Sequence, residues 1–212
     1  MICIIPARGG SKRLKGKNLY TLDGEFIINK VISIAKESML FSEIIVSTDS
    51  EQIRDIVIGA RVSMRPDKIS GDIAEDEVLK WTAEEYWANT ICRIYPFAVL
   101  LTPERLRKGF LEFKSGKYDN VHECQKYAHN PIRAFSLNGG YYDKSIISMP
   151  SEFLGSWYHD AGTYMFTGIE ALNKPLGERN IKWMPVKEWE AQDLDDADDW
   201  EVLRMKYEWG RP

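Results

Sequence analysis

A run of basic and glycine residues near the N-terminus has the composition of a phosphate-binding loop. Residues 8–17, Arg-Gly-Gly-Ser-Lys-Arg-Leu-Lys-Gly-Lys, hold five cations and three glycines and follow directly on the apolar, strand-like segment 1–7. Glycines that leave a buried strand expose backbone N–H groups, and the flanking Arg and Lys side chains add positive charge. A charge run alone is more typical of a solvated basic loop. The strand before this run and the glycines inside it favour phosphate binding.

A pair of carboxylates near the C-terminus could hold a divalent cation. Asp193 and Asp195 lie two residues apart, between an expected strand and the last helix, and in an extended chain their side chains point the same way. Mg²⁺ takes one or two carboxylates and completes its shell with water and substrate phosphates. The alternative is an acidic helix N-terminus, which we adopt for Asp196, Asp198 and Asp199. On spacing alone both interpretations of the pair stay open, and the phosphate-type loop favours the metal.

Two common phosphate-binding motifs do not fit the basic loop. A P-loop needs four residues between its glycines and a Ser or Thr after the Lys, whereas five residues separate Gly10 from Gly16 and Asn18 follows Lys17. The Gly9-Gly10 pair also has no place in the Gly-x-Gly-x-x-Gly frame of a dinucleotide-binding turn.

The elements that would position these groups alternate along the chain. We expect helices at 26–39, 53–59, 75–87 and 196–207, with a fifth opening at Thr102 as N-cap and Pro103 in its first turn. We expect strands at 2–5, 44–46, 61–64, 91–95, 120–124, 132–137, 161–166 and 181–186. Strand-helix alternation predicts a parallel sheet. Asn138-Gly139-Gly140 is a hairpin signal, so we expect an inserted antiparallel element at about 118–145 within a single domain, 1–212.

Composition limits the function classes. The 212 residues are 44% hydrophobic and carry a net charge of −4, which is enough apolar sequence for a sizeable core and argues against a general nucleic-acid binder. No apolar run approaches the ~20 residues of a membrane span. Cys3, Cys92 and Cys124 lack metal-ligand spacing and are expected to be reduced core thiols. We therefore expect a cytoplasmic protein that contacts neither membrane nor nucleic acid.

The chain resembles a known enzyme family in motifs that follow in order along most of its length. These motifs are Ile4–Arg13 with Lys17-Asn18, Val46–Glu51, Arg65-Pro66, Ile94-Tyr95-Pro96 and Leu100–Pro103. Together they resemble the CMP-nonulosonate cytidylyltransferases, which are the CMP-sialic acid synthetases and their relatives. Three further segments are most similar to the pseudaminic acid branch: Pro131–Ala134, Tyr158–Gly162 and Gln192–Asp195.

The resemblance implies a doubly wound, mostly parallel α/β domain of the Rossmann-like nucleotidyltransferase type. Its members join CTP to the anomeric hydroxyl of a nine-carbon acidic sugar, release pyrophosphate and tend to be homodimers. The resemblance assigns catalytic roles on the triphosphate to Arg8 and Lys17, and Mg²⁺ binding to Asp193 and Asp195. The nucleotide-binding set that it implies is Ala7, Arg8, Gly9, Gly10, Ser11, Lys17, Asn18 and Arg65. Without the family context, Arg65 would be an ordinary surface arginine.

Candidates for the sugar pocket have structural alternatives of equal weight. His159 and Asp160 could act on the sugar, but a polar residue at a strand start is as common, and neighbours on a strand face opposite ways. Arg133 could pair with the sugar carboxylate or make a surface salt bridge. Of the tryptophans, Trp157 and Trp189 lie near the proposed site.

Departures from the family pattern bear on substrate choice, and they leave two alternative functions open. Relatives usually carry Thr and Pro around segment 95–100, where this chain has Phe97 and Val99, and small hydroxyl residues are common where it has Ile73-Ala74-Glu75. The alternatives are a CMP-Kdo synthetase or other sugar-nucleotide enzyme, and an inactive nucleotide-binding module.

Overall fold

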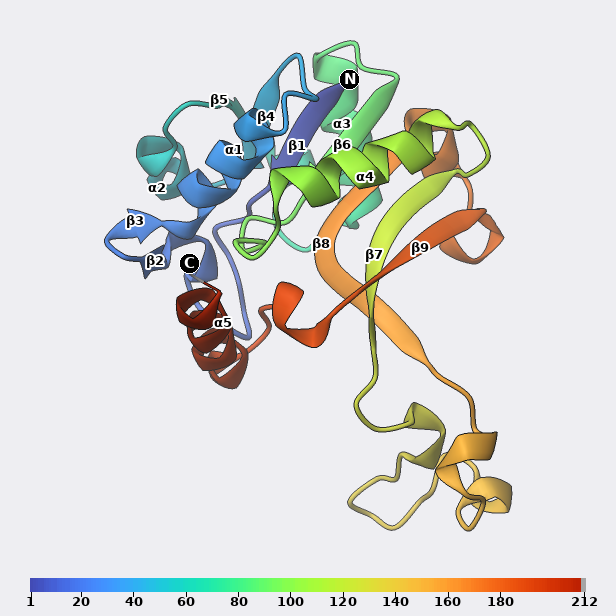
Figure 1. The fold of residues 1–212 in the computed structure, drawn as a ribbon. Helices are drawn as coiled ribbons and strands as arrows, with labels where there is room; N and C mark the ends of the chain where they lie inside the picture. Colours follow the sequence, from blue (N-terminus) through green and yellow to red (C-terminus); the bar gives the residue numbers. More distant parts are fainter. Residues whose placement is uncertain (211–212) are drawn as a thin grey trace.

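A seven-stranded sheet forms the centre of the molecule (Figure 1). The structure, a computed structural model, describes residues 1–210. The strands are β1 (Ile2–Pro6), β4 (Ile44–Thr48), β5 (Arg61–Met64), β6 (Thr90–Ile94), β7 (Asn120–Lys126), β8 (Tyr158–Gly168) and β9 (Ile181–Val186). Their order across the sheet is β5-β4-β1-β6-β8-β7-β9. A separate two-stranded hairpin, β2 (Thr21–Leu22) and β3 (Glu25–Phe26), precedes the first helix.

The sheet is mostly parallel, as the sequence predicted. β1 pairs in parallel with β4 on one side and β6 on the other, β4 with β5, and β7 with β9. Only β8 runs against its neighbours, β6 and β7. Because the chain moves outward from β1 in both directions, a crevice forms at the carboxyl ends of β1, β4 and β6, where α/β proteins bind ligands.

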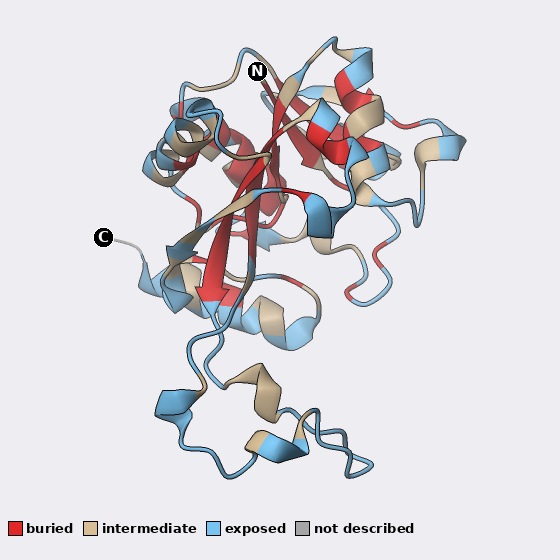
Figure 2. Cartoon of the chain, turned by 90° about the vertical axis from the view of Figure 1, so that its right-hand side faces the viewer, coloured by how far each residue is buried: buried red, intermediate tan, exposed pale blue. Residues whose placement is uncertain are grey.

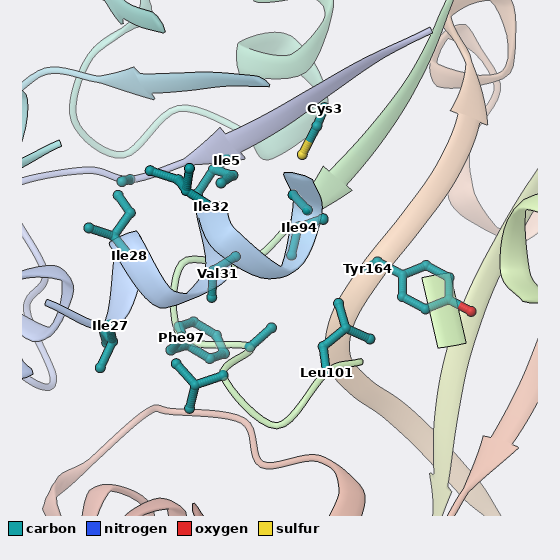
Figure 3. Packing of buried hydrophobic residues seen from close by; sticks show 14 of the residues in the cluster. Cys3, Ile5, Ile27, Ile28, Val31, Ile32, Ile94, Phe97, Leu101 and Tyr164 are labelled. Atoms are coloured by element: carbon teal, nitrogen blue, oxygen red, sulfur yellow. The ribbon is translucent and has the colours of Figure 1, made fainter. Parts of the chain in front are cut away.

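Helices cover both faces of the sheet, which confirms the doubly wound α/β fold. The α-helices are α1 (Ile27–Glu37), α2 (Glu51–Ile56), α3 (Glu75–Glu85), α4 (Pro103–Lys114) and α5 (Ala197–Trp209). Alternate β1 side chains serve the two faces: Cys3 and Ile5 pack in one cluster with residues of α1 and α4, while Ile4 packs in the other with Leu79 of α3. Figure 3 shows the first cluster from close by.

The expected helix and strand positions agree with the structure to within a few residues for most elements. Thr102 caps α4 by accepting a hydrogen bond from Arg105 N, and Asp196 caps α5 by accepting one from Asp199 N. All three cysteines are free and buried, as predicted. Within residues 1–210, no helix combines the length and the apolar character needed to cross a membrane.

An arm of residues 127–157 leaves the sheet between β7 and β8, and Figure 2 shows most of it exposed. The expected strand at 132–137 is wrong: residues Pro131–Arg133 form a 3₁₀ turn, because Pro131 fixes its own φ and the Asn130 side chain caps the turn. The expected turn at 138–140 is present, with Tyr142 N donating to Ala134 O at 2.8 Å and one bridge between Phe135 and Tyr141. Because β7 belongs to the main sheet, the excursion begins later and ends later than the 118–145 expected from the sequence.

A buried ion pair fastens the C-terminal part of the chain to the sheet. Glu123 on β7, 2% exposed, accepts from Arg105 Nε at 2.8 Å and from Thr163 Oγ1 at 2.8 Å. Arg105 also donates to the backbone oxygen of Glu190 at 2.6 Å, just before the segment that carries Asp193.

Replacing Glu123 should therefore be costly. In Glu123→Gln the Arg105 charge stays buried without its counter-charge, and we expect the free energy of unfolding to fall by about 3–5 kcal/mol. The matched control is Glu201→Gln, which breaks an exposed pair with Arg204 on α5 and should cost less than about 1 kcal/mol. Urea unfolding of both variants measures the difference, and equal losses would contradict an anchoring role for the pair.

Candidate functional site

The basic loop is fastened to the end of β4 by one carboxylate. Asp49 Oδ1 accepts from Gly9 N at 2.7 Å, and Asp49 Oδ2 accepts from Gly71 N at 3.1 Å. Burial raises the pKa of Asp49, but these backbone hydrogen bonds and the Arg65 charge outweigh burial and lower it overall. Asp49 thus joins the loop after β1 to the loop after β5. A Cβ on Gly9 would lie 2.7 Å from Ser50 Cβ, so this approach requires glycine.

A cavity of about 210 Å³ opens at the carboxyl ends of β1 and β6. It is lined by Pro6, Arg8, Ser11, Lys17, Asn18, Arg65, Gly71, Ile73, Glu75, Val78, Tyr95, Pro96 and Phe97. It therefore brings together five of the predicted nucleotide-binding residues: Arg8, Ser11, Lys17, Asn18 and Arg65. Ala7 and Gly9-Gly10 lie in the chain segment that connects Pro6 to Ser11, outside the cavity lining.

Two buried oxygens of the cavity lack a hydrogen-bond partner within residues 1–210. Ser11 Oγ is one, and Asn18 Oδ1 is the other, while the amide nitrogen of Asn18 donates to Arg8 O at 2.9 Å. Both residues are buried. Unsatisfied buried polar groups are costly, so two of them in one cavity indicate a place where a polar ligand completes the hydrogen bonding.

The cations of the loop are held by carboxylates from elsewhere in the chain. Arg8 donates to Asp72 Oδ1 at 2.6 Å, and Lys12 contacts the other oxygen of the same carboxylate. Hydrogen bonds from Lys12 and Arg8 lower the pKa of Asp72. An anionic group is therefore already accommodated between these two side chains, as a phosphate would be.

Lys17 lies between the cavity and the C-terminal carboxylates. Its Nζ donates to Leu194 O and lies 3.9 Å from Asp195 Oδ1. Burial lowers the pKa of Lys17 even though Asp195 and Asp193 act in the opposite direction. Sequence positions 17 and 195, predicted to share a site, are adjacent in space.

Arg65 is buried at the side of the cavity and is not an ordinary surface arginine. Its Nε donates to Ser47 Oγ at 3.0 Å and a terminal nitrogen donates to Ser47 O at 2.6 Å. Burial lowers its pKa, partly offset by Asp49 and Glu75.

The Asp193-Asp195 pair has the donor set for a hard cation. Asp193 is exposed on one side. Protein atoms around its carboxyl group and the charge of Asp195 raise its pKa, and a hydrogen bond from Leu194 N acts in the opposite direction. Gly162, at φ 64°, leaves room for this side chain, because a Cβ there would lie 3.2 Å from Asp193 Cβ. Asp195 accepts from Arg13 at 2.5 Å. No group of three or more His, Cys, Asp or Glu side chains suited to a metal occurs within residues 1–210, so an ion here would need phosphate or water ligands as well.

The three sugar-pocket candidates lie outside the cavity lining. Arg133 lies in the arm, donates to Ser151 Oγ at 3.3 Å and lines a separate polar pocket of about 390 Å³ that also includes Trp157. His159 packs its ring 4.7 Å from that of Tyr127. Asp160 Oδ2 lies 3.2 Å from His122 Nδ1. Burial raises the pKa of Asp160, but the hydrogen bond with His122 and the Arg93 charge outweigh burial and lower this pKa overall.

Sequence reasoning missed several residues of the site. Asp49 lies within the family motif Val46–Glu51, but the sequence assigns it no binding or structural role. Its only signal in the sequence is its place directly after a strand. Arg93 is a charged residue within an apolar strand, which is a signal for a buried ion pair; its Nε lies 2.8 Å from Glu75 Oε1. Trp189, expected near the site, instead lies in a separate groove with Met205 and Trp209.

Comparison with protein families decides the class of this site. Residues 2–140 match the family described as cytidylyltransferase. The chain belongs to the cytidylyltransferase family. As a member, it is a nucleotidyltransferase, and all the residues that line the cavity fall within the matched region.

Individual relatives and structures agree with the family. A pseudaminic acid cytidylyltransferase of Campylobacter jejuni is 30% identical over 178 residues, which cover 78% of this chain and 77% of that protein. An N-acylneuraminate cytidylyltransferase of Streptococcus agalactiae is 38% identical over 127 residues, which cover 58% of this chain and 30% of that protein. A CMP:2-keto-3-deoxy-manno-octonic acid synthetase complexed with CTP shares the fold, with a TM-score of 0.75 over 99% of both chains at 16% identity.

The tight approach of Gly9 to β4 gives a direct test of the loop geometry in this cytidylyltransferase. Gly9→Ala would force its new methyl group against Ser50, so we expect a loss of about 1–3 kcal/mol in the free energy of unfolding. Gly10→Ala is the matched control, because a Cβ at Gly10 meets nothing within 4 Å, and it should change stability by less than about 1 kcal/mol. Denaturant unfolding distinguishes the two; a Gly9→Ala protein as stable as Gly10→Ala would show that the loop is not held as described.

Proposed function

We propose that this chain transfers CMP from CTP to the anomeric hydroxyl of a nine-carbon acidic sugar, pseudaminic acid or a related sialic acid, and releases pyrophosphate. The observation that carries the proposal is the cavity with its unpartnered Ser11 Oγ and Asn18 Oδ1, bounded by Arg8 and Lys17. The names of the relatives from Campylobacter and Streptococcus supply the sugar class.

The residues of the site act mainly by placing two anions together. The basic loop receives the triphosphate, where Arg8 and Lys17 neutralise charge that grows on the phosphates as the sugar oxygen attacks the α-phosphorus. Ser11 Oγ can donate to a phosphate oxygen, and Asn18 Oδ1 can accept from a hydroxyl of the nucleotide. Arg65 supplies a fixed cation at the side of the cavity, consistent with nucleotide recognition.

Asp193 and Asp195 are the residues that would hold Mg²⁺. Their fit is supported by the donor set, because two carboxylates separated by one residue are hard oxygen ligands and Gly162 leaves room for the Asp193 side chain. A bound Mg²⁺ supplies charge neutralisation on the phosphates and on the leaving pyrophosphate.

Measurement of pyrophosphate release tests the reaction. With CTP and Mg²⁺ we expect release with one nine-carbon acid among pseudaminic, N-acetylneuraminic and legionaminic acids, and none with Kdo or with ATP, GTP or UTP. A chelator should abolish release.

Asp195→Asn should lower the rate about a hundredfold, whereas Asp198→Asn, an exposed acid in the first turn of α5, should change it less than about twofold.

Other outcomes would contradict specific parts of this proposal. Release with Kdo alone would support the octonic acid enzyme, and CTP binding without release from any sugar would support a binding module. An Asp195→Asn variant with full Mg²⁺-dependent activity would remove the metal assignment.

We further propose that the protein is a homodimer whose arms, residues 127–157, contact the partner copy. The arm carries large apolar side chains in solvent: Phe135, Leu137, Tyr142 and Phe153 are each more than half exposed. Exposed apolar side chains gathered in one segment are typical of interaction surfaces.

Sedimentation equilibrium tests this assembly. We expect a dimer for the wild type and a shift toward monomer for the double variant Leu137→Ser, Phe153→Ser. The control Met39→Ser, at an exposed position after α1, should stay dimeric. A monomeric wild type at micromolar concentration would contradict the proposal.

A further inference from the structure

Four side chains form a stack that leads from the buried centre of the sheet to the phosphate loop. The Arg93 guanidinium lies 3.8 Å from the centre of the Tyr95 ring. The rings of Tyr95 and Phe97 are stacked, with centroids 5.2 Å apart and planes 11° from parallel. Lys17 Nζ lies 4.8 Å from the centre of the Phe97 ring. The order is therefore cation, ring, ring, cation.

Much of the stack is shielded from water, although both rings also line the cavity. Arg93 is 3% exposed and Phe97 4% exposed. The faces of aromatic rings carry partial negative charge and attract cations, and the attraction grows when water is excluded. Glu75 lies beside the Arg93 end, with 2.8 Å between Glu75 Oε1 and Arg93 Nε, so the buried cation at that end is paired.

Lys17 has two competing attractions, and the first is Leu194 O, to which its Nζ donates a hydrogen bond. Asp195 Oδ1 lies 3.9 Å from Lys17 Nζ, and a closer carboxylate would cancel the charge that a phosphate needs. An aromatic face attracts the ammonium group without neutralising it. Phe97 can therefore keep Lys17 at the cavity and leave its charge available.

We propose that Phe97, backed by Tyr95 and Arg93, is a positioning residue that holds Lys17 Nζ at the triphosphate. This inference rests on the proposed function.

The simpler alternative is that Phe97 only fills the core. Figure 3 shows Phe97 in the same cluster as Val31 and Leu101. A filling role requires only volume, so other apolar residues would serve. The stack requires the electron density of the ring, which can be changed with almost no change in shape.

The test replaces Phe97 site-specifically by phenylalanines with one, two and three ring fluorines. Calorimetry then measures the affinity for inorganic tripolyphosphate and for CTP, both in the presence of a chelator. We expect a stepwise loss that reaches roughly tenfold with three fluorines, because each fluorine weakens the negative face of the ring. Phe97→Leu should show a similar loss, and Phe97→Tyr should retain wild-type affinity.

The same fluorine series at Phe113 is the matched control. Phe113 packs on Phe166, with ring centroids 6.1 Å apart, and does not line the cavity. Fluorination there should leave both affinities unchanged.

Two results would overturn the inference. Affinities that stay constant across the Phe97 series would show that the ring only fills space. A wild type that binds neither tripolyphosphate nor CTP, with the chelator or with Mg²⁺ in its place, would contradict the phosphate site and the proposed function together. If the wild type binds CTP but releases no pyrophosphate, only the proposed reaction fails, and the fluorine series still decides the role of Phe97.

Discussion

The position of one ammonium group joins two parts of the chain that are far apart in sequence. Lys17 Nζ donates to Leu194 O and lies near Asp195, so the loop after the first strand and the segment before the last helix meet at this group. Lys17 lines the cavity and also lies near the Asp193-Asp195 pair. A nucleotidyltransferase needs both beside the same phosphates, which is why the rest of the fold can be understood as support for this junction.

Three cations of the loop pair with carboxylates from elsewhere in the chain. Arg8 and Lys12 pair with Asp72, and Arg13 pairs with Asp195. These pairs are exposed to water, and such pairs contribute at most about 1 kcal/mol each. A triphosphate can therefore take over the cations at little cost, whereas the buried contacts beneath the loop stay fixed.

The sequence predicts the layout of the fold well because apolar periodicity decides it, and the strand at 181–186 is correct to the residue. It predicts the residues around the cavity through the family resemblance. It fails where local chemistry overrides propensity, as at Pro131, where a turn replaces the expected strand. It also gives no role to Asp49, because a carboxylate that binds the backbone N–H of Gly9, 40 positions away, leaves no local pattern. Arg133 could not be placed from sequence, since its setting depends on how the arm folds.

A structure of the protein with CTP and Mg²⁺ would test the central claim most directly. We predict that triphosphate oxygens lie at the backbone of Gly9-Gly10 and at Ser11 Oγ, that Lys17 contacts the phosphates, and that Asp193 and Asp195 hold the metal. A nucleotide bound elsewhere, with Ser11 Oγ and Asn18 Oδ1 still unpartnered, would contradict it.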